Sequence, residues 1–271
     1  MIKLYPNYHL AYVVPENVTA ESGVVLGFST KHGGVSQGRL TNMNMSFSRG
    51  DAPENVTENY RRLAEALGVA EKGIYSNHQV HGNQVRVVDV TDEKTGFFAE
   101  LEYDAAVTDR EDVILTAVHA DCIPIFFYDP VRRVIGAAHS GWKGTVLEVA
   151  AETVKKMTAT YGTKSGDVQV WIGPGICKDC FLVRNDVYQH FLNTLPWSKA
   201  YMEQVAEDQF TVDMKGIITT SLQNCGVQTE NIHDMKLCTS CQEGLFFSHR
   251  RDKGNTGAMV GMIALCKQAQ V

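Results

Sequence analysis

Apolar residues along this chain gather in short runs that predict β-strands. Most runs are apolar at consecutive positions and do not alternate with polar residues, which is typical of strands covered on both faces. Val, Ile and Phe are frequent in them, and these residue types favour extended structure. The predicted strands span residues 24–29, 84–90, 113–119, 123–128, 134–139, 168–172 and 245–248.

Helices are predicted where apolar residues recur every three to four positions. Asp and Pro mark the helix starts, and Gly marks several of the ends. Asp213 has the side chain of an N-cap, and Gly226 follows the helix that it begins. The predicted helices run from Pro53 to Leu67, from Val146 to about Thr160, from Met214 to about Cys225, and from Asn255 or Thr256 through Met259, Met262 and Ile263 to Cys266.

The order of these elements predicts the fold class. Strands come in groups and do not alternate strictly with helices, which favours α+β layers over a doubly wound sheet. The chain has 271 residues, of which 44% are hydrophobic, enough for one large core. We therefore expect a single domain over residues 1–271, with mixed β-sheets flanked by helices.

Charge and cysteine content exclude several functional classes. The net charge is −6 and no cluster of Lys and Arg stands out, so we expect no nucleic-acid partner. The first sixteen residues lack the pattern of a signal peptide. No apolar run approaches the roughly 20 residues that span a bilayer. Seven cysteines, an odd number, predict reduced thiols in a cytoplasmic protein. The oligomeric state stays open.

Three short blocks place metal-ligating side chains at predicted strand ends. Cys and His are the ligands that zinc prefers, and three of them leave a fourth coordination position open for chemistry. Residues three apart on a strand face opposite ways. At most one of His78 and His81, and one of His119 and Cys122, is therefore expected to join His139. The blocks are Gln-Val-His-Gly at 79–82, His-Ala-Asp-Cys at 119–122 and Ala-His-Ser-Gly-Trp-Lys-Gly at 138–144.

Other interpretations of these residues stay open. Cys122 could be a nucleophile with His139 as its base, which would make a hydrolase that needs no metal. A non-catalytic binding protein would need no open coordination site. The Gly-rich turn that carries Lys143 leads into a helix and could bind an anion through its free backbone N–H groups.

Two Cys-x-x-Cys pairs suggest a further metal site. Cys177 with Cys180, and Cys238 with Cys241, have knuckle spacing and together could form a closed zinc site. The pairs lie much further apart in sequence than in compact zinc ribbons. We therefore favour two independent, reduced pairs over a shared metal.

Taken together, the motifs resemble the YfiH/YlmD family, also called the multicopper polyphenol oxidase (laccase) domain family. The resemblance runs from about residue 24 to the end of the chain, and its specificity comes from the shared order of the motifs. The matching motifs are Phe-Ser-Thr at 28–30, Gly-Gly-Val-Ser at 33–36, Asn-Met-Asn-Met-Ser at 42–46, the three blocks above, Tyr-Asp-Pro at 128–130, Ile-Gly-Pro at 172–174, and Ser-His-Arg-Arg-Asp at 248–252 followed by Thr-Gly at 256–257.

The resemblance implies a YfiH-type α+β fold and a zinc ion held by His81, Cys122 and His139. The several His-rich motifs that a multicopper oxidase needs are absent from the sequence. Members of the family are regarded as purine nucleoside phosphorylases with adenosine deaminase and methylthioadenosine phosphorylase activity. A bacterial branch is named a peptidoglycan editing factor, which removes a wrongly incorporated amino acid from a cell-wall precursor.

The resemblance thus leads us to expect a zinc-dependent enzyme that acts on adenosine, inosine and methylthioadenosine with phosphate. An open zinc site could also activate water to deaminate adenosine. A Cys-His amidase acting on a peptidoglycan precursor and a non-catalytic nucleoside-binding protein are the alternatives. His81, Cys122 and His139 are the expected catalytic residues. Asn44 and His32 are candidate contacts to sugar or base, and Lys143 and Arg250 to phosphate.

The chain departs from the family pattern at several of these positions. Lys143 stands where the family often has Arg, and it keeps the charge but loses the bidentate fork. His249, His119 and His32 replace a common Tyr, Thr and Arg. These additional histidines widen the choice of candidate ligands.

Overall fold

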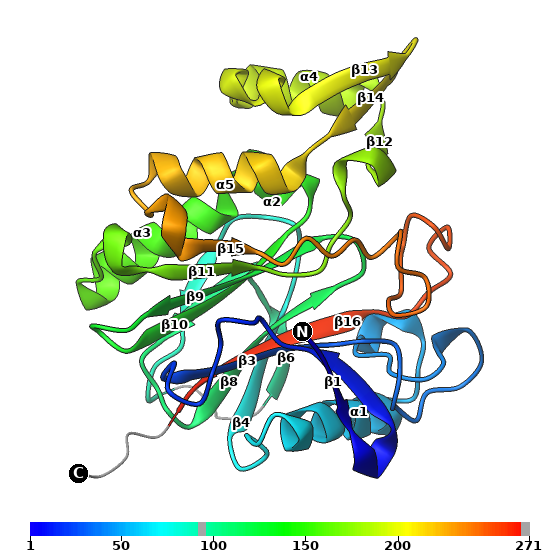
Figure 1. Ribbon diagram of the computed structural model, residues 1–271, viewed down its shortest axis with the longest axis vertical. Coiled ribbons are helices and arrows are strands. Elements are labelled where there is room, and N and C mark those ends of the chain that lie inside the picture. The colour runs from blue at the N-terminus through cyan, green and yellow to red at the C-terminus, as the bar shows by residue number, and fades with distance from the viewer. Residues whose placement is uncertain (92–95, 267–271) are drawn as a thin grey trace.

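Two large β-sheets form the centre of the computed structural model, which describes residues 1–91 and 96–266 (Figure 1). A smaller antiparallel sheet lies beside them, in the order β12 (Leu182–Val183), β14 (Gln209–Val212) and β13 (Met202–Ala206). The seven-stranded sheet has the order β1 (Ile2–Tyr5), β2 (Leu10–Val13), β3 (Val24–Ser29), β16 (Met259–Leu265), β8 (Val113–His119), β4 (Gly73–His78) and β6 (Gly96–Glu102). The six-stranded sheet has the order β15 (Ile232–Asp234), β11 (Gln169–Ile172), β9 (Ile123–Asp129), β10 (Val134–Ser140), β7 (Ala105–Thr108) and β5 (Val85–Val87).

The two large sheets pack on each other, and helices cover their outer faces. Alternate side chains of β8 show this arrangement: Leu115 and Ala117 lie in the core between the sheets, whereas Ile114 belongs to the core on the α1 side. None of the helices within residues 1–91 and 96–266 has the length and apolar character needed to cross a membrane. The helices are α1 (Pro53–Ala66) on the seven-stranded sheet, α2 (Trp142–Val146), α3 (Val149–Tyr161) and α5 (Met214–Asn224) on the six-stranded sheet, and α4 (Asn185–Thr194) beside the small sheet.

The layered α+β class predicted from sequence is confirmed, as are most of its elements. The strands predicted at 24–29 and 113–119 have those bounds, and the strands at 123–128, 134–139 and 168–172 differ by one residue. The strand at 84–90 shortens to β5. Asp213 caps α5 by accepting a hydrogen bond from the N–H of Gly216 at 3.0 Å. The second predicted helix, from Val146 to about Thr160, corresponds to α3, which begins three residues later because Val146 ends the short α2 and Glu148 adopts a left-handed conformation with φ of 54°.

Two predicted elements are wrong, and burial explains both. The final helix, expected from Asn255 or Thr256 to Cys266, is the central strand β16, which pairs with β3 and β8. Both faces of β16 are buried, so its continuous apolar run contains helical spacing by coincidence. Residues 245–248 are not a strand: a turn ends at Leu245, the N–H groups of Leu245 and Phe246 donate to the carbonyl of Gln242, and residues 246–248 are irregular. Their apolar character comes from the burial of Phe246 and Phe247.

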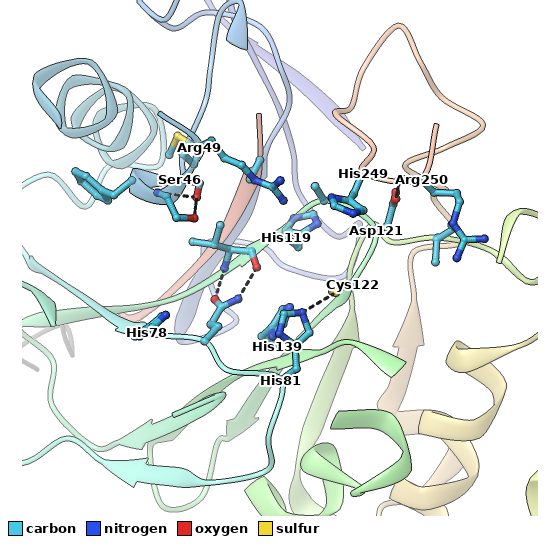
Figure 2. A pocket seen from close by; sticks show the side chains of 18 of the residues that line it. Ser46, Arg49, His78, His81, His119, Asp121, Cys122, His139, His249 and Arg250 are labelled. Atoms are coloured by element: carbon cyan, nitrogen blue, oxygen red, sulfur yellow. Dashed lines mark hydrogen bonds between the residues drawn. The ribbon is translucent and has the colours of Figure 1, made fainter. Parts of the chain in front are cut away.

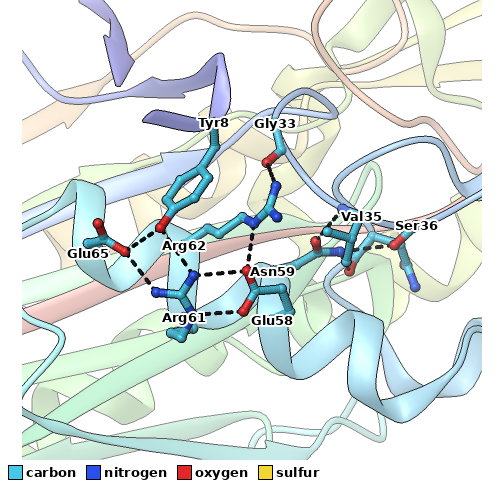
Figure 3. Close-up of polar contacts among 10 residues, drawn as sticks. Tyr8, Gly33, Val35, Ser36, Glu58, Asn59, Arg61, Arg62 and Glu65 are labelled. Atoms are coloured by element: carbon cyan, nitrogen blue, oxygen red, sulfur yellow. Dashed lines mark hydrogen bonds and ion pairs between the residues drawn. The ribbon is translucent and has the colours of Figure 1, made fainter. Parts of the chain in front are cut away.

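Helix α1 anchors a long loop that ends near the candidate site (Figure 3). The fully buried Asn59 accepts a hydrogen bond from the N–H of Val35 at 2.9 Å. Its amide nitrogen donates to Ser36 Oγ at 2.9 Å and to the carbonyl of Asn44 at 2.8 Å. Arg62 donates to the carbonyl of Gly33 at 3.0 Å. These contacts fix the start and middle of the loop, and its end reaches the cavity described below.

Candidate metal centre

Three ligands from three separate segments meet at one edge of the sheets (Figure 2). His81 lies in the turn after β4, Cys122 joins β8 to β9, and His139 lies in β10. Their ligand atoms are all within 4.8 Å of one another. His81 Nε2 is 3.9 Å from Cys122 Sγ. The rings of His81 and His139 pack edge to face, with their centroids 4.9 Å apart. The structure thus brings together the three residues that the resemblance selects.

A single buried carboxylate, Asp104, positions both histidines. Its Oδ1 is 2.9 Å from His139 Nδ1 and accepts a hydrogen bond from the N–H of His81 at 2.9 Å. Its Oδ2 accepts from the N–H groups of Gly82 and Val80 at 2.6 and 3.2 Å. Because Nδ1 of His139 faces the carboxylate, its Nε2 is left for the shared site. Burial opposes ionisation, but the hydrogen bond from His139 holds the pKa of Asp104 below its usual value.

Sequence reasoning missed Asp104. Its only signal is that an acidic residue directly precedes strand β7. The first residue of this strand, Ala105, pairs with Ala138 of β10. The strand register places Asp104 beside His139, and this register cannot be read from the local sequence.

Gly141 allows the chain to pass close to the ligands. A Cβ at this position would lie 2.7 Å from the His81 ring and 3.0 Å from Cys122 Sγ. Its φ of −74° is ordinary, so the need for glycine is steric. The Gly-rich turn therefore packs directly against His81 and Cys122, two of the three candidate metal ligands.

Cys122 and His139 shift each other's ionisation. Burial acts to raise the pKa of the Cys122 thiol, but the charge of His139 and hydrogen bonds from both histidines lower it to about 6. Burial acts to lower the pKa of His139, but the Cys122 charge and the Asp104 hydrogen bond raise it to about 9. A thiolate beside an imidazolium is the form favoured near neutral pH when no metal is bound.

The donor set fits a zinc ion. Zinc binds thiolate at about 2.3 Å and imidazole at about 2.0–2.1 Å, so a tetrahedral site places sulfur and nitrogen about 3.5 Å apart. The distance of 3.9 Å between Cys122 and His81 needs only a small adjustment. Asp104 supplies the carboxylate contact that ligating histidines usually have. With three protein ligands, one coordination position would face outward from the group.

The three ligands line a cavity of 1010 Å³. His119 lies in its wall and is only 2% exposed, and neither ring nitrogen has a hydrogen-bond partner within the described part of the chain. Burial lowers the pKa of His119 to about 3, so its ring is neutral and offers one donor and one acceptor. The other polar lining residues include Ser46, Arg49, Ser76, Gln79, His249 and Arg250.

The four candidate substrate contacts lie in different places. Arg250 lines the cavity, where its guanidinium lies over the Phe181 ring at 5.3 Å. Lys143 is exposed on α2 and is not part of the lining. Asn44 is fully buried, and its side chain bonds to Ser46, Asp51 and Ala258. His32 donates from Nε2 to the carbonyl of Gly244 at 2.5 Å. Of these four residues, the structure therefore places only Arg250 in the lining of the cavity that the three ligands share.

The two Cys-x-x-Cys pairs, which we expected to be independent, lie next to each other in the structure. The sulfurs of Cys177, Cys180, Cys238 and Cys241 lie within 4.8 Å of one another. All seven cysteines are free thiols, as the sequence predicts. The pairs converge because β11 and β15, which precede them, are parallel neighbours.

Fold and site define an α+β protein with a three-ligand group open to a cavity, and comparisons identify its family. The family model for multi-copper polyphenol oxidoreductase laccase matches residues 25–266. Purine nucleoside phosphorylase YlmD of Bacillus subtilis is 35% identical over 247 residues, which cover 89% of this chain and 88% of that protein. Human purine nucleoside phosphorylase LACC1 is 35% identical over 88% of this chain and 55% of its own length.

Solved structures agree with the sequence comparisons. The crystal structure of YlmD from Geobacillus stearothermophilus matches with a TM-score of 0.84 and 34% identity, over 91% of this chain and 93% of that chain. A Bacillus licheniformis protein described as hypothetical protein YfiH matches with a TM-score of 0.85 and 33% identity, over 90% and 93%. This chain belongs to the YfiH/YlmD family.

Proposed function

We propose that this chain is a zinc-dependent purine nucleoside phosphorylase that acts on adenosine, inosine and methylthioadenosine and also deaminates adenosine. The observation that carries the proposal is the group of His81, Cys122 and His139 at the wall of a large cavity. The relatives named purine nucleoside phosphorylase support the reaction class. The free thiols favour a reducing compartment, and we propose the cytoplasm as the place where the protein acts.

The metal site would be held by His81, Cys122 and His139, with Asp104 as the carboxylate behind His139. When bound, zinc would supply a Lewis acid at a position open to the cavity. Asp104 keeps the proton of His139 on Nδ1, which leaves Nε2 free to ligate. The apolar lining of the cavity, including Phe47 and Phe181, suits a purine ring and excludes water from it.

The remaining polar groups of the wall suit the rest of a nucleoside and phosphate. The neutral His119 can donate to and accept from the edge of a base, which would satisfy its two buried nitrogens. Arg49 and Arg250 bring positive charge to the cavity, where phosphate and the developing charge of phosphorolysis need it. We propose these two arginines as the phosphate contacts in place of Lys143.

Product analysis tests the reaction. Purified protein is incubated with adenosine, inosine or methylthioadenosine, with and without phosphate, and products are identified by mass spectrometry. Phosphorolysis predicts free base and ribose 1-phosphate (from methylthioadenosine, the methylthio sugar phosphate) only when phosphate is present. Deamination predicts inosine from adenosine in either condition. Cys122→Ser should abolish both reactions, and the absence of all these products with the wild-type protein would overturn the proposal.

The phosphate assignment is tested by two variants measured side by side. Arg250→Ala should raise the KM for phosphate about tenfold or more, because a charged hydrogen bond contributes about 1.5–3 kcal/mol. Lys143→Ala should leave this constant near the wild-type value, since Lys143 lies outside the lining. The opposite order of effects would return the phosphate contact to Lys143.

A second candidate function has one specific observation in its favour. The lowered pKa of Cys122 and the raised pKa of His139 describe an activated nucleophile and its partner, as a Cys-His amidase needs. Such an enzyme would release an amino acid from a peptidoglycan precursor, and chelators would not inhibit it. Binding of nucleosides without turnover would instead identify a non-catalytic binding protein.

A further inference from the structure

Four cysteines form a second cluster, made of residues that the site above does not use. Cys177 directly precedes a single 3-10 turn, Lys178–Cys180, in the loop after β11, and Cys180 is the last residue of that turn. Cys238 and Cys241 lie in the turn that follows β15. The Sγ atoms of Cys180 and Cys241 are 3.4 Å apart, those of Cys177 and Cys241 are 3.9 Å apart, and all four lie within 4.8 Å.

These distances fit a tetrahedral metal site. A zinc ion with four Zn–S bonds of about 2.3 Å places its sulfurs roughly 3.8 Å apart. A disulfide would bring two sulfurs to about 2.05 Å, which none of these cysteines shows. All four sulfurs cluster together, as a shared ion requires, whereas two disulfides would require separate pairs.

The backbone is arranged to support thiolates. Cys238 Sγ accepts hydrogen bonds from the N–H groups of Cys177 and Cys241 at 3.3 and 3.4 Å. Each Cys-x-x-Cys turn thus directs an N–H group at a sulfur of the cluster, and such hydrogen bonds stabilise negative charge on it. Two N–H groups that donate to the buried Cys238 sulfur favour its thiolate form over its neutral thiol form.

The two loops are also held together before any ion binds. Gly175 and Cys238 form a parallel β-bridge. The N–H of Gly175 donates to the carbonyl of Leu237 at 3.1 Å, and the N–H of Thr239 donates to the carbonyl of Gly175 at 3.2 Å. The ligands are therefore preorganised on two segments that are 61 residues apart from Cys177 to Cys238.

We propose that Cys177, Cys180, Cys238 and Cys241 bind a structural zinc ion. Zinc suits the site because it prefers tetrahedral thiolate ligands and carries no redox chemistry of its own. Four protein ligands leave no coordination position for a substrate, so this ion serves to hold the loops.

The clamped loops connect to the cavity through Asp121, the residue before Cys122. Thr239 donates from its hydroxyl to Asp121 Oδ1 at 2.6 Å, and the N–H of Ile176 donates to the carbonyl of Asp121 at 2.9 Å. Ile176 and Phe181, which flank the first cysteine pair, line the cavity. Loss of the ion should therefore loosen one wall of the cavity without removing a ligand of the His81 group.

Metal analysis of the purified protein tests the proposal. We expect two zinc ions per chain in the wild-type protein, measured by inductively coupled plasma mass spectrometry. Cys238→Ser/Cys241→Ser should lose one zinc ion, and Cys122→Ser should lose the other. Cys225→Ser, a free cysteine outside both groups, is the matched control and should keep two.

X-ray absorption at the zinc edge of the wild-type protein gives a readout that does not depend on how a variant folds. The wild-type spectrum should be the average of two zinc ions. One is coordinated by four sulfurs at about 2.3 Å, and the other has a nitrogen-rich shell. In Cys122→Ser the remaining zinc should be coordinated by sulfur alone. The double variant should also raise the Kd of a nucleoside bound in the cavity severalfold, while its remaining zinc keeps the nitrogen-rich shell.

Three outcomes would overturn the second site. They are a single zinc ion in the wild-type protein with these four thiols open to alkylation, disulfides among the four in freshly purified protein, and iron at this position. None of these measurements uses catalysis, so the second site and the proposed reaction can fail independently of each other.

Discussion

Asp104 is the residue on which the geometry of the candidate centre most depends. It contacts the Nδ1 of His139 and three N–H groups of the His81 turn. Asp104→Asn keeps the shape but removes the charge and half of the acceptors. We expect zinc affinity at this site to fall about 10- to 100-fold, as for other carboxylates behind ligating histidines, measured by competition with a chromogenic chelator.

A distant aspartate provides the control for this variant. Asp208 is exposed and accepts one hydrogen bond, from the N–H of Asn185. Asp208→Asn should leave zinc affinity unchanged. Unchanged affinity in Asp104→Asn as well would show that Asp104 does not position the ligands.

Cys122 should behave as a low-pKa thiol in the metal-free protein. Its pKa is lowered to about 6, below the usual value for cysteine, so the thiolate persists above that pH and is lost as the pH falls through it. Alkylation by iodoacetamide, followed by peptide mass spectrometry, should be nearly constant from about pH 7 upward and fall below about pH 6.

The comparison thiol is Cys225, whose pKa is raised by burial. Its alkylation should still increase above pH 9, in contrast to that of Cys122. A Cys122 profile that also rises with a midpoint near 9 would contradict the mutual effect of Cys122 and His139. Zinc should protect Cys122 from alkylation at every pH in this range.

The types of the three ligand residues could be predicted from the sequence, but their partners could not. His81, Cys122 and His139 stand in short blocks at predicted strand ends, and the resemblance selects them. Asp104 and His119 owe their roles to strand register and burial, which local sequence does not encode. Lys143 has the right charge beside a Gly-rich turn, yet it is exposed and is not part of the lining.

At the scale of elements, the turn from β10 into α2 depends on the absence of a side chain at Gly141. In Gly141→Ala the new methyl group would meet the His81 ring at 2.7 Å and Cys122 Sγ at 3.0 Å. The turn or the ligands must shift, so we expect weaker zinc binding at this site and turnover lowered at least tenfold. Zinc content and steady-state kinetics would measure both effects.

Gly244→Ala is the matched control, because a Cβ there meets nothing within 4 Å. This variant should keep full zinc content and turnover. If Gly141→Ala behaves in the same way, the turn is more adaptable than its close packing implies and glycine is not needed for steric reasons.

Elements on the protein's flanks were easier to predict from sequence than its central strand. Helices α1 and α5 have clear start signals in Pro53 and Asp213, and a glycine follows the end of each helix. Strand β16 has neither, because it is buried on both faces between β3 and β8. Its side chains alternate between two cores, which the sequence shows only as a continuous apolar run.

At the scale of the whole molecule, packing between the two large sheets should make the chain unfold as one unit. Phe126 is fully buried between the sheets and meets Phe28 edge to face at 5.4 Å. Phe126→Ala should lower the free energy of unfolding by about 3–5 kcal/mol, measured by urea denaturation. Val131→Ala, at a position that is 69% exposed, should change it little.

Fluorescence and circular dichroism should report the same unfolding midpoint, because we propose that residues 1–271 form one domain. Two separate transitions would contradict that proposal.

The convergence of the two Cys-x-x-Cys pairs is also a property of the whole molecule. It depends on the parallel pairing of β11 with β15. Because 57 residues separate Cys180 from Cys238, this pairing could not be predicted from the local sequence.

Reconstitution with zinc tests the central claim most directly. Protein depleted of metal is titrated with zinc while phosphate-dependent release of base from adenosine is measured, in the wild type and in Cys122→Ser. We predict that wild-type turnover rises in proportion to zinc bound at the His81 group, and that Cys122→Ser binds zinc only at the four-cysteine cluster and stays inactive. Full turnover without metal, or in Cys122→Ser, would contradict the account.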